Sequence, residues 1–230
     1  MSLQGWVDLL TRDNLLFLAR GLWVTIVVTV LSGAISTVFG LALGTYRSLA
    51  RGWARLPATL FVEAFRNLPV LVLVYFIRFG SSGLGVSFGA ISAAVIGLSL
   101  YGSAMCAEAF RAGIESVPRG QLVAARASGL RLLQAYRFVI LPQAVKYALP
   151  SYVGQLIVLL QATTLVSAIG VLELTGAATV LFNRYANPLE TFVLLAVVYL
   201  ILDYLLSLIR RRLERAQRPG RVAPVLQTLG

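Results

Sequence analysis

The sequence predicts an all-α integral membrane protein with five transmembrane helices. Its 230 residues are 58% hydrophobic and only 13% charged, whereas a soluble domain has about 45–50% apolar and about 25% charged residues. The mean hydropathy is +0.83, and a water-soluble fold of this length could not bury so much apolar surface. The third observation is the length of the apolar runs, because a spanning helix needs about 20 mostly apolar residues.

The five predicted spans cover residues 21–46, 57–79, 87–110, 145–170 and 189–210. Three contain long runs without any charge, and two contain a few charges, Glu63 and Arg66 in the second span and Asp203 in the fifth. All five runs are too long for buried strands. The preceding segment, around 6–18, is predicted to be a short amphipathic helix at the membrane surface or a frayed tail. It is not a cleavable signal, since acidic residues interrupt its basic region.

The distribution of basic residues predicts the orientation in the membrane. With five spans, three segments share one side and hold fifteen of the twenty cations. These are Arg47, Arg51, Arg55, Arg111, Arg119, Arg126, Arg131, Arg137, Lys146, Arg210, Arg211, Arg212, Arg215, Arg218 and Arg221. Because cytoplasmic loops carry the excess of Lys and Arg, the N-terminus is predicted outside and the C-terminus in the cytoplasm. The net charge of +11 is therefore a signal of orientation, and no nucleic-acid partner is needed to explain it.

Several kinds of chemistry are excluded by composition. The chain has no histidine and one cysteine, Cys106, so it has no imidazole base, no thiolate metal cluster and no disulfide framework. Its only lysine, Lys146, follows Pro-Gln-Ala-Val, so the chain has no phosphate-binding loop of the Gly-x-x-x-x-Gly-Lys type. No metal site is expected.

One long loop, 111–142, interrupts the series of spans. Pro118 suits the first turn of a helix and Gly129 suits a left-handed position after its end. Ala124 and Ala125 are small enough for another protein to approach the helix closely. The pattern alone is equally compatible with docking of a partner and with an amphipathic helix that rests on the bilayer.

This loop resembles the EAA loop in the membrane subunits of bacterial ABC importers. That pattern is Glu-Ala-Ala, three residues, Gly, nine residues and Ile-x-Leu-Pro; here residues 123–129 are Val-Ala-Ala-Arg-Ala-Ser-Gly and residues 139–142 are Val-Ile-Leu-Pro. Flanking sequences resemble the polar amino-acid branch, at 65–72, 107–114, 116–121, 141–144 and 163–170. The resemblance covers about 20–215. Val123 replaces the usual Glu, and Gln161-Ala162 replaces a frequent Lys-Asp pair.

The resemblance implies a single transmembrane permease domain, 1–230, with the fold of type I importers and a cytoplasmic coupling helix. It implies a subunit of the bacterial inner membrane that moves a polar amino acid of the histidine, glutamine or glutamate type and is not itself an enzyme. The implied partners are a second permease subunit, identical or paralogous, two ATPases that bind ATP and Mg²⁺, an extracytoplasmic amino-acid-binding protein, and membrane lipid. No cofactor is expected on this chain. The residues implied in coupling to the ATPase are Gly120, Ala124, Ala125, Ser128, Gly129 and Leu130.

Polar residues inside the predicted spans are candidates for a substrate pathway, because such groups should face the bundle or a wet cavity. Arg66 is expected near mid-membrane, either paired with Glu63 or in contact with a substrate carboxylate. Asn67 is assigned to the same pathway. Pro69 either kinks the helix or opens a break along the pathway. Glu108 is expected to pair with Arg111.

Gln161, Thr163 and Thr164 form a second polar group in the fourth span. They are expected either to make interhelical hydrogen bonds or to line the pathway for a zwitterion. Two other classes of protein compete with the permease: a channel or membrane scaffold without ATPase coupling, and an intramembrane enzyme. The absence of histidine argues against the enzyme, and the long loop argues against the channel.

Overall fold

The computed structural model describes residues 3–217, and within that range every regular element is helical. The α-helices are α1 (Leu3–Leu9), α2 (Arg12–Leu49), α3 (Leu56–Asn67), α4 (Val70–Arg78), α5 (Ala90–Glu115), α6 (Arg119–Ala127), α7 (Leu132–Ala135), α8 (Leu141–Ala162), α9 (Leu174–Tyr185) and α10 (Pro188–Gln217). Four short elements join them: η1 (Gly52–Arg55), η2 (Gly80–Leu84), the π-helical η3 (Tyr136–Ile140) and η4 (Thr163–Ile169). The predicted all-α class is confirmed for these residues.

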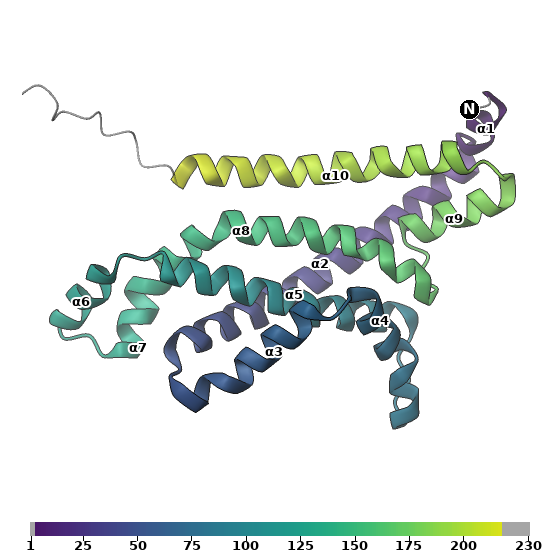
Figure 1. Cartoon of the computed structure of the whole chain (residues 1–230). Helices are drawn as coiled ribbons and strands as arrows, with labels where there is room; N and C mark the ends of the chain where they lie inside the picture. Colours follow the sequence, from purple (N-terminus) through teal and green to yellow (C-terminus); the bar gives the residue numbers. More distant parts are fainter. Residues whose placement is uncertain (1–2, 218–230) are drawn as a thin grey trace, which may run out of the picture.

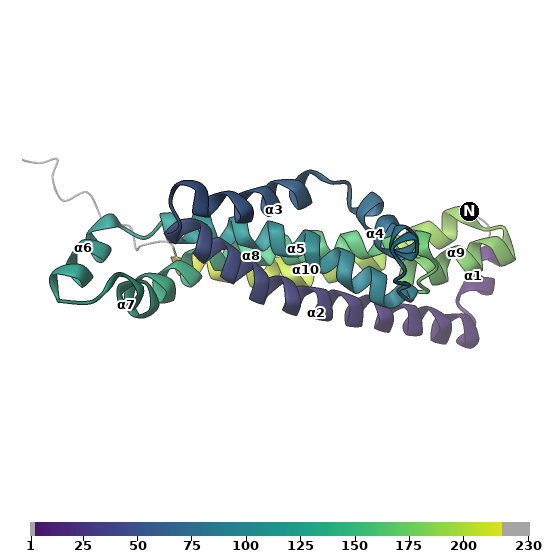
Figure 2. The ribbon, with the colours of Figure 1, turned by 90° about the horizontal axis from the view of Figure 1, so that it is seen from below.

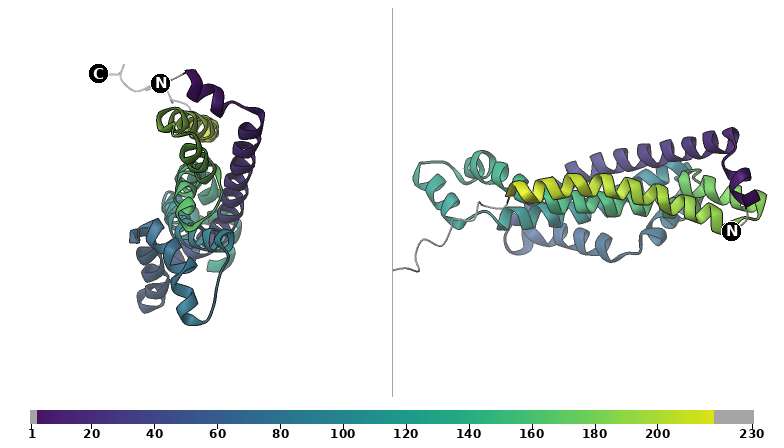
Figure 3. Two further views of the ribbon diagram at one scale, coloured as in Figure 1. Left: turned by 90° about the vertical axis from the view of Figure 1, so that its right-hand side faces the viewer. Right: turned by 90° about the horizontal axis from the view of Figure 1, so that it is seen from above.

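The long helices form an elongated bundle with two distinct ends. Helices α2, α5, α8 and α10 run along its length, and α6 and α7 project from one end (Figures 1 and 2). At the opposite end α1 lies against α9 and the start of α10 (Figure 3), where the side-chain amide of Asn187 donates to the carbonyl of Gly5 at 3.1 Å. We call these the α6 end and the α9 end.

The described residues contain four helices long and apolar enough to span a membrane, and a bent pair supplies a fifth if its halves count as one span. The first span, α2, begins at Arg12, so most of the predicted surface segment is its first turns and only α1 is separate. In the fourth, the α-helix ends at Ala162 and η4 continues to Ile169. The last, α10, extends to Gln217, beyond the expected end at 210.

The second predicted span, 57–79, is broken at Pro69, the second of the two alternatives expected there, and the chain turns by 102° between α3 and α4. Pro69 has no N–H to donate into the helix, and it disfavours helical geometry at the residue before it. Leu68 accordingly has an extended ψ of 132°. Pro69 therefore produces a full break rather than a kink.

Helix α9 was not predicted, since its 12 residues are too few for a span. Glu173 caps its N-terminus: its two carboxylate oxygens accept from the backbone N–H groups of Thr175 and Gly176, each at 2.9 Å. The side chain of Glu173 is fully buried, and it also accepts hydrogen bonds from Thr25 of α2 at 3.2 Å and Tyr199 of α10 at 3.1 Å. One carboxylate thus joins three helices.

Close packing of α2 on α5 fixes the α6 end of the bundle. A Cβ atom at Gly40 would lie 2.4 Å from Cβ of Cys106, and one at Gly44 would lie 2.6 Å from the carbonyl oxygen of Ala107. Real Cβ atoms do not come so close, so only glycine permits this approach. The contact places Arg47, one turn after Gly44, beside Glu108.

Candidate functional site

Helix α6 is held in a defined conformation at the tip of the α6 end. Gly129 has a φ of +86°, a left-handed conformation that favours glycine. Its N–H donates to the carbonyl of Arg126 at 3.1 Å, and the N–H of Leu130 donates to the carbonyl of Ala125 at 3.2 Å. These two bonds form a Schellman motif, so the Gly at the expected position of the loop pattern ends α6 and reverses the chain toward α7.

An apolar cluster anchors the loop to the spans. Ile114 at the end of α5 and Val117 just after it are buried against Ile140 and Ala144, and Leu122 of α6 packs on them. The apolar side chains thus connect α6 both to the end of α5 and to the start of α8. A displacement of α6 would therefore be transmitted directly to two spanning helices.

One side of α6 is left exposed, and small or apolar residues form it. Gly120, Val123, Ala124 and Ala127 are exposed, and their spacing of three and four residues places them on one face of the helix. We call these four residues the coupling face. Val123 is 68% exposed, and space around Gly120 is open. The residue that replaces the usual Glu thus adds an apolar side chain to this face.

Among the residues implied in coupling, Ala125 requires a correction. It is only 6% exposed, in a helix that packs against α7 and η3, so its side chain offers almost no surface to an ATPase. Ala124 remains available. Ser128 is exposed and donates to the carbonyl of Ala124 at 3.0 Å, and Leu130 is half-buried at the end of the Schellman motif.

Three arginine side chains lie within 4 Å of the carboxylate of Glu108 at the α6 end. Nη1 of Arg47 lies 2.8 Å from Oε2 of Glu108, and Nε of Arg111 lies 2.9 Å from its Oε1. Nη1 of Arg66 is 3.8 Å from the same carboxylate. The structure therefore places Glu108 beside Arg111, as the spacing predicts, but it also brings in two arginines from α2 and α3.

The expected pairing of Arg66 with Glu63 is wrong. Arg66 turns toward Glu108 of α5, whereas Oε2 of Glu63 accepts from the side-chain amide of Asn67 at 3.5 Å. The side chain of Glu108 is 26% exposed whereas Glu63 is exposed, so water screens the attraction between Arg66 and Glu108 less than it would screen a pair with Glu63. Arg66 stays 35% exposed, and Asn67 is exposed at the α3–α4 break.

The second polar group forms an interhelical contact. Nε2 of Gln161 donates to Oδ2 of Asp203 in α10 at 2.6 Å. Thr163 is fully buried and donates to the carbonyl of Leu160 at 2.6 Å, so of the two expected roles the lining of a pathway is excluded for this residue. Thr164 bonds to the carbonyl of Gln161 at 2.8 Å. Within residues 3–217 no hydrogen bond or ion pair joins this group to Arg66 or Asn67.

The sequence interpretation missed two residues that organise the helices, Arg47 and Glu173. It treated Arg47 only as one of the basic residues that mark the cytoplasmic side, yet Arg47 is 5% exposed. Its position one turn after Gly44 and two turns after Gly40 was an available signal, because those glycines bring that face of α2 against α5. Glu173 follows Val-Leu and precedes Leu-Thr-Gly. A negatively charged side chain is stabilised at the N-terminus of a helix, so this lone Glu before Leu174 was the available signal for a helix that begins there.

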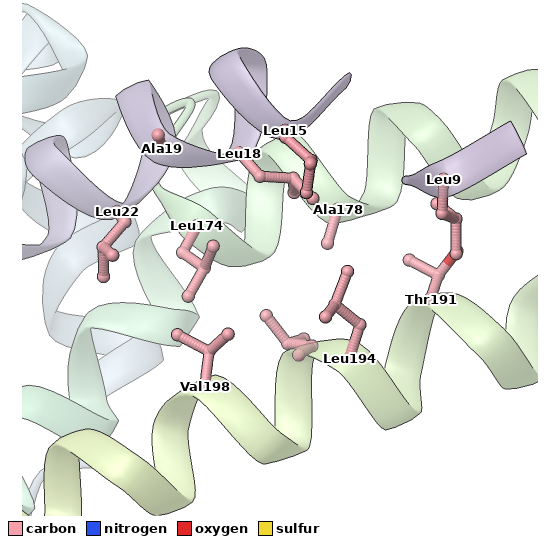
Figure 4. Close-up of a pocket in the computed structure, with 11 residues that line it drawn as sticks. Leu9, Leu15, Leu18, Ala19, Leu22, Leu174, Ala178, Thr191, Leu194 and Val198 are labelled. Atoms are coloured by element: carbon pink, nitrogen blue, oxygen red, sulfur yellow. The ribbon is translucent and has the colours of Figure 1, made fainter. Parts of the chain in front are cut away.

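An apolar cavity of about 170 Å³ lies at the α9 end, between α1, α2, α9 and α10 (Figure 4). Leu18 and Leu22 of α2 face Leu194 and Val198 of α10 across it. Thr191 is the one lining residue with a polar side-chain atom. A charged zwitterion would lose its hydration there without compensating partners, so this cavity is unsuited to a polar amino acid.

The chain matches a known family of membrane proteins over most of its length. Residues 36–219 match the family described as the inner membrane component of binding-protein-dependent transport systems. A similar curated protein is the probable glutamine ABC transporter permease protein GlnP of Bacillus subtilis, 34% identical over 93% of this chain and all of that protein. Another is the histidine/lysine/arginine/ornithine transport system permease protein HisM of Salmonella typhimurium, 33% identical over 92% of this chain and 94% of that one.

Solved structures show the same fold. A chain from the crystal structure of an amino acid ABC transporter with histidines superposes with a TM-score of 0.82 at 31% identity, covering 89% of this chain and 95% of that one. A chain from the inward-facing MetNI methionine ABC transporter gives 0.73 at 26% identity, covering 90% and 99%. These likenesses confirm the predicted importer-like fold.

Proposed function

Because this chain belongs to the family of inner membrane components of binding-protein-dependent transport systems, we propose that it is the permease subunit of an ATP-driven ABC importer for a polar amino acid. The observation that carries the proposal is the coupling face of α6, a surface of small and apolar residues that is anchored to two spans and projects beyond them. The names of the similar permeases supply the substrate class, since they refer to glutamine and to histidine, lysine, arginine and ornithine.

The working transporter needs partners that this chain does not supply. We propose a second permease subunit, two cytoplasmic ATPases and an extracytoplasmic binding protein that delivers the amino acid. ATP and Mg²⁺ would be bound by the ATPases, and membrane lipid surrounds the apolar flanks of α2 and α10. Exposed large apolar side chains are abundant on these two helices, which suits contact with lipid or with a second permease.

Motion would pass from the ATPases to the spans through α6. Closure of the ATPase pair on ATP would shift α6 as a rigid unit, because the Schellman motif and the cluster around Ile114 and Ile140 fix its orientation. The ends of α5 and α8 would follow. The two arrangements of the spans then form a two-state element, with ATP acting on one side and the loaded binding protein on the other.

The proposed orientation puts the α6 end in the cytoplasm and the α9 end outside. The α6 end carries Arg47, Arg55 and Arg119, and α10 reaches it with Arg210 and Arg215. This charge asymmetry supports a cytoplasmic α6 end. It also places the coupling face where a cytoplasmic ATPase could reach it.

For the substrate pathway we propose the α3–α4 break, with Arg66 as the residue that meets the substrate carboxylate. Its distance of 3.8 Å from Glu108 is too long for a strong hydrogen bond, so the guanidinium keeps donors for a ligand. Asn67 is exposed at the break beside it. We also assign Gln161 and Thr164 to this pathway. The side-chain amide of Gln161 donates a hydrogen bond to Asp203.

The test is co-purification of the full-length chain from native membranes in mild detergent, with partners identified by mass spectrometry. We expect an ABC ATPase to co-purify with the wild type and to be lost with Ala124→Arg, which places a long charged side chain on the coupling face. Ala54→Arg is the matched control, because Ala54 is also exposed at the α6 end but lies in η1. Retention of the ATPase by Ala124→Arg would refute the proposed docking surface.

A further inference from the structure

A basic cavity of about 420 Å³ lies at the α6 end, behind the coupling face. It is bounded by the end of α2, η1, the end of α5, α6 and η3. Its lining includes three arginines, Arg47, Arg55 and Arg119, and a single acidic residue, Glu115. The cavity thus joins three separate stretches of chain that each contribute a cation.

The positive charge of this cavity is incompletely balanced. Glu115 is an ion-pair partner of Arg111, and Arg47 is paired with Glu108 through its Nη1 atom. Within residues 3–217 neither Arg55 nor Arg119 has an acidic partner. An anion in the cavity would therefore meet at least two guanidinium groups that no carboxylate of the described chain neutralises.

Arg47 provides the second, independent observation. Its side chain is only 5% exposed, yet its Nε has no hydrogen-bond partner among the described residues and is shielded from solvent. A buried donor without an acceptor is costly and rare in native proteins. Because Nε is shielded in this conformation, a bound ligand would satisfy it only if the Arg47 side chain turned this atom toward the cavity that the residue lines.

From this geometry we propose that the cavity is a binding site for a phosphate group. The planar guanidinium fork of arginine matches the oxygens of phosphate with paired hydrogen bonds. Ile114, Leu122 and Ile140 add an apolar wall, which suits the first methylene groups of the acyl chains of a phospholipid. The phosphate belongs either to an anionic lipid of the inner leaflet or to a soluble phosphate compound; the cytoplasmic location rests on the orientation proposed above.

A phosphate group bound in this cavity would bridge α6 and the rest of the bundle without a covalent bond. Arg119 begins α6, Arg55 ends η1, and Arg47 is on α2. A ligand bound by all three would restrain α6 relative to α2. The site would therefore connect the anion content of the membrane or cytoplasm to the element that carries the coupling face.

Native mass spectrometry of the full-length chain in detergent tests this site, with phosphatidylglycerol as the probe. The test variant is Arg55→Gln/Arg119→Gln, because both side chains are exposed and neither is ion-paired in the described chain. Arg47 is left intact, since its removal would orphan Glu108. The matched control is Arg51→Gln/Arg137→Gln, which removes two exposed arginines that do not line the cavity.

We expect the test variant to bind phosphatidylglycerol about tenfold more weakly than the wild type, and the control to stay within about twofold. Diacylglycerol, which lacks the phosphate, should bind weakly to all three proteins. Competition by millimolar inorganic phosphate would identify a site open to soluble phosphate, and its failure would assign the site to the lipid headgroup. Equal losses in both double variants, or equal binding of diacylglycerol and phosphatidylglycerol, would overturn the proposal.

Discussion

Arg47 and Glu108 form a 2.8 Å ion pair that joins α2 to α5. The arginine side chain is 5% exposed and the glutamate side chain 26%, so the pair is shielded on the α2 side and open to solvent on the other. Arg66 and Arg111 approach the same carboxylate from α3 and from the next turn of α5. This single acidic residue therefore holds together the part of the bundle from which α6 projects.

We predict that Glu108→Gln lowers the stability of the purified protein by about 1–3 kcal/mol, because it leaves the buried guanidinium of Arg47 without a counter-charge. The estimate is kept below that for a fully buried pair, since Glu108 is partly solvated. The measurement is the detergent melting temperature. Glu115→Gln is the control, because Glu115 is 59% exposed and its loss should cost less than about 0.5 kcal/mol. Equal shifts would show that Glu108 has no organising role.

Gly129→Ala should destabilise the end of α6 by about 1–2 kcal/mol, since the φ of +86° forces a Cβ into the left-handed region. The readout is hydrogen–deuterium exchange of the backbone N–H groups at the substituted position and at Leu130, which should become faster. Gly120→Ala is the matched control, because Gly120 is helical with open space around it; it should leave exchange unchanged or slow it. Faster exchange in the control alone would contradict the Schellman motif.

Gln161→Leu should cost about 1–3 kcal/mol, because it removes the donor to Oδ2 of Asp203 and leaves that carboxylate unsatisfied. The double variant Gln161→Leu/Asp203→Leu should recover most of this stability, as replacement of both polar partners by apolar groups often does. Melting temperatures of the three proteins test the pair. A double variant less stable than Gln161→Leu would mean that Asp203 has another essential partner.

The proposed orientation can be tested by cysteine labelling. The sole cysteine, Cys106, is buried and is replaced by Ala in the background variant. Ser82→Cys in η2 and Ser128→Cys after α6 are both exposed. In intact spheroplasts a membrane-impermeant maleimide should label Ser82→Cys, and should label Ser128→Cys only after permeabilisation. The reverse pattern would place α6 outside and remove it from contact with a cytoplasmic ATPase.

Sequence patterns predicted the long apolar helices well, because mean hydropathy reports burial in lipid directly. The loop tip was also predictable: Pro118 precedes the first residue of α6 and Gly129 follows its end, as their backbone preferences require. Local rules of this kind need no knowledge of neighbouring helices.

The ion-pair partners, the burial of individual side chains and the angle between α3 and α4 depend on tertiary packing and were not predictable from local sequence. Arg66 pairs with Glu108 and not with Glu63 because α5 packs against α3. The spacing of residues along one helix cannot reveal a partner on another helix. Ala124 and Ala125 are neighbours in the motif, yet the packing of α6 against α7 and η3 leaves the first exposed and the second buried. Pro69 indicated an interruption of the helix, but the angle of 102° between α3 and α4 depends on what these two helices pack against.

The central claim is best tested by amino-acid uptake into proteoliposomes that contain this chain with its partner permease and ATPases. With the loaded binding protein outside and Mg²⁺-ATP inside, a radiolabelled polar amino acid should accumulate in the lumen. Accumulation should require ATP, fall to background with Ala124→Arg and persist with Ala54→Arg. Accumulation that is independent of ATP, or unchanged by Ala124→Arg, would contradict the account of a permease driven through the coupling face of α6.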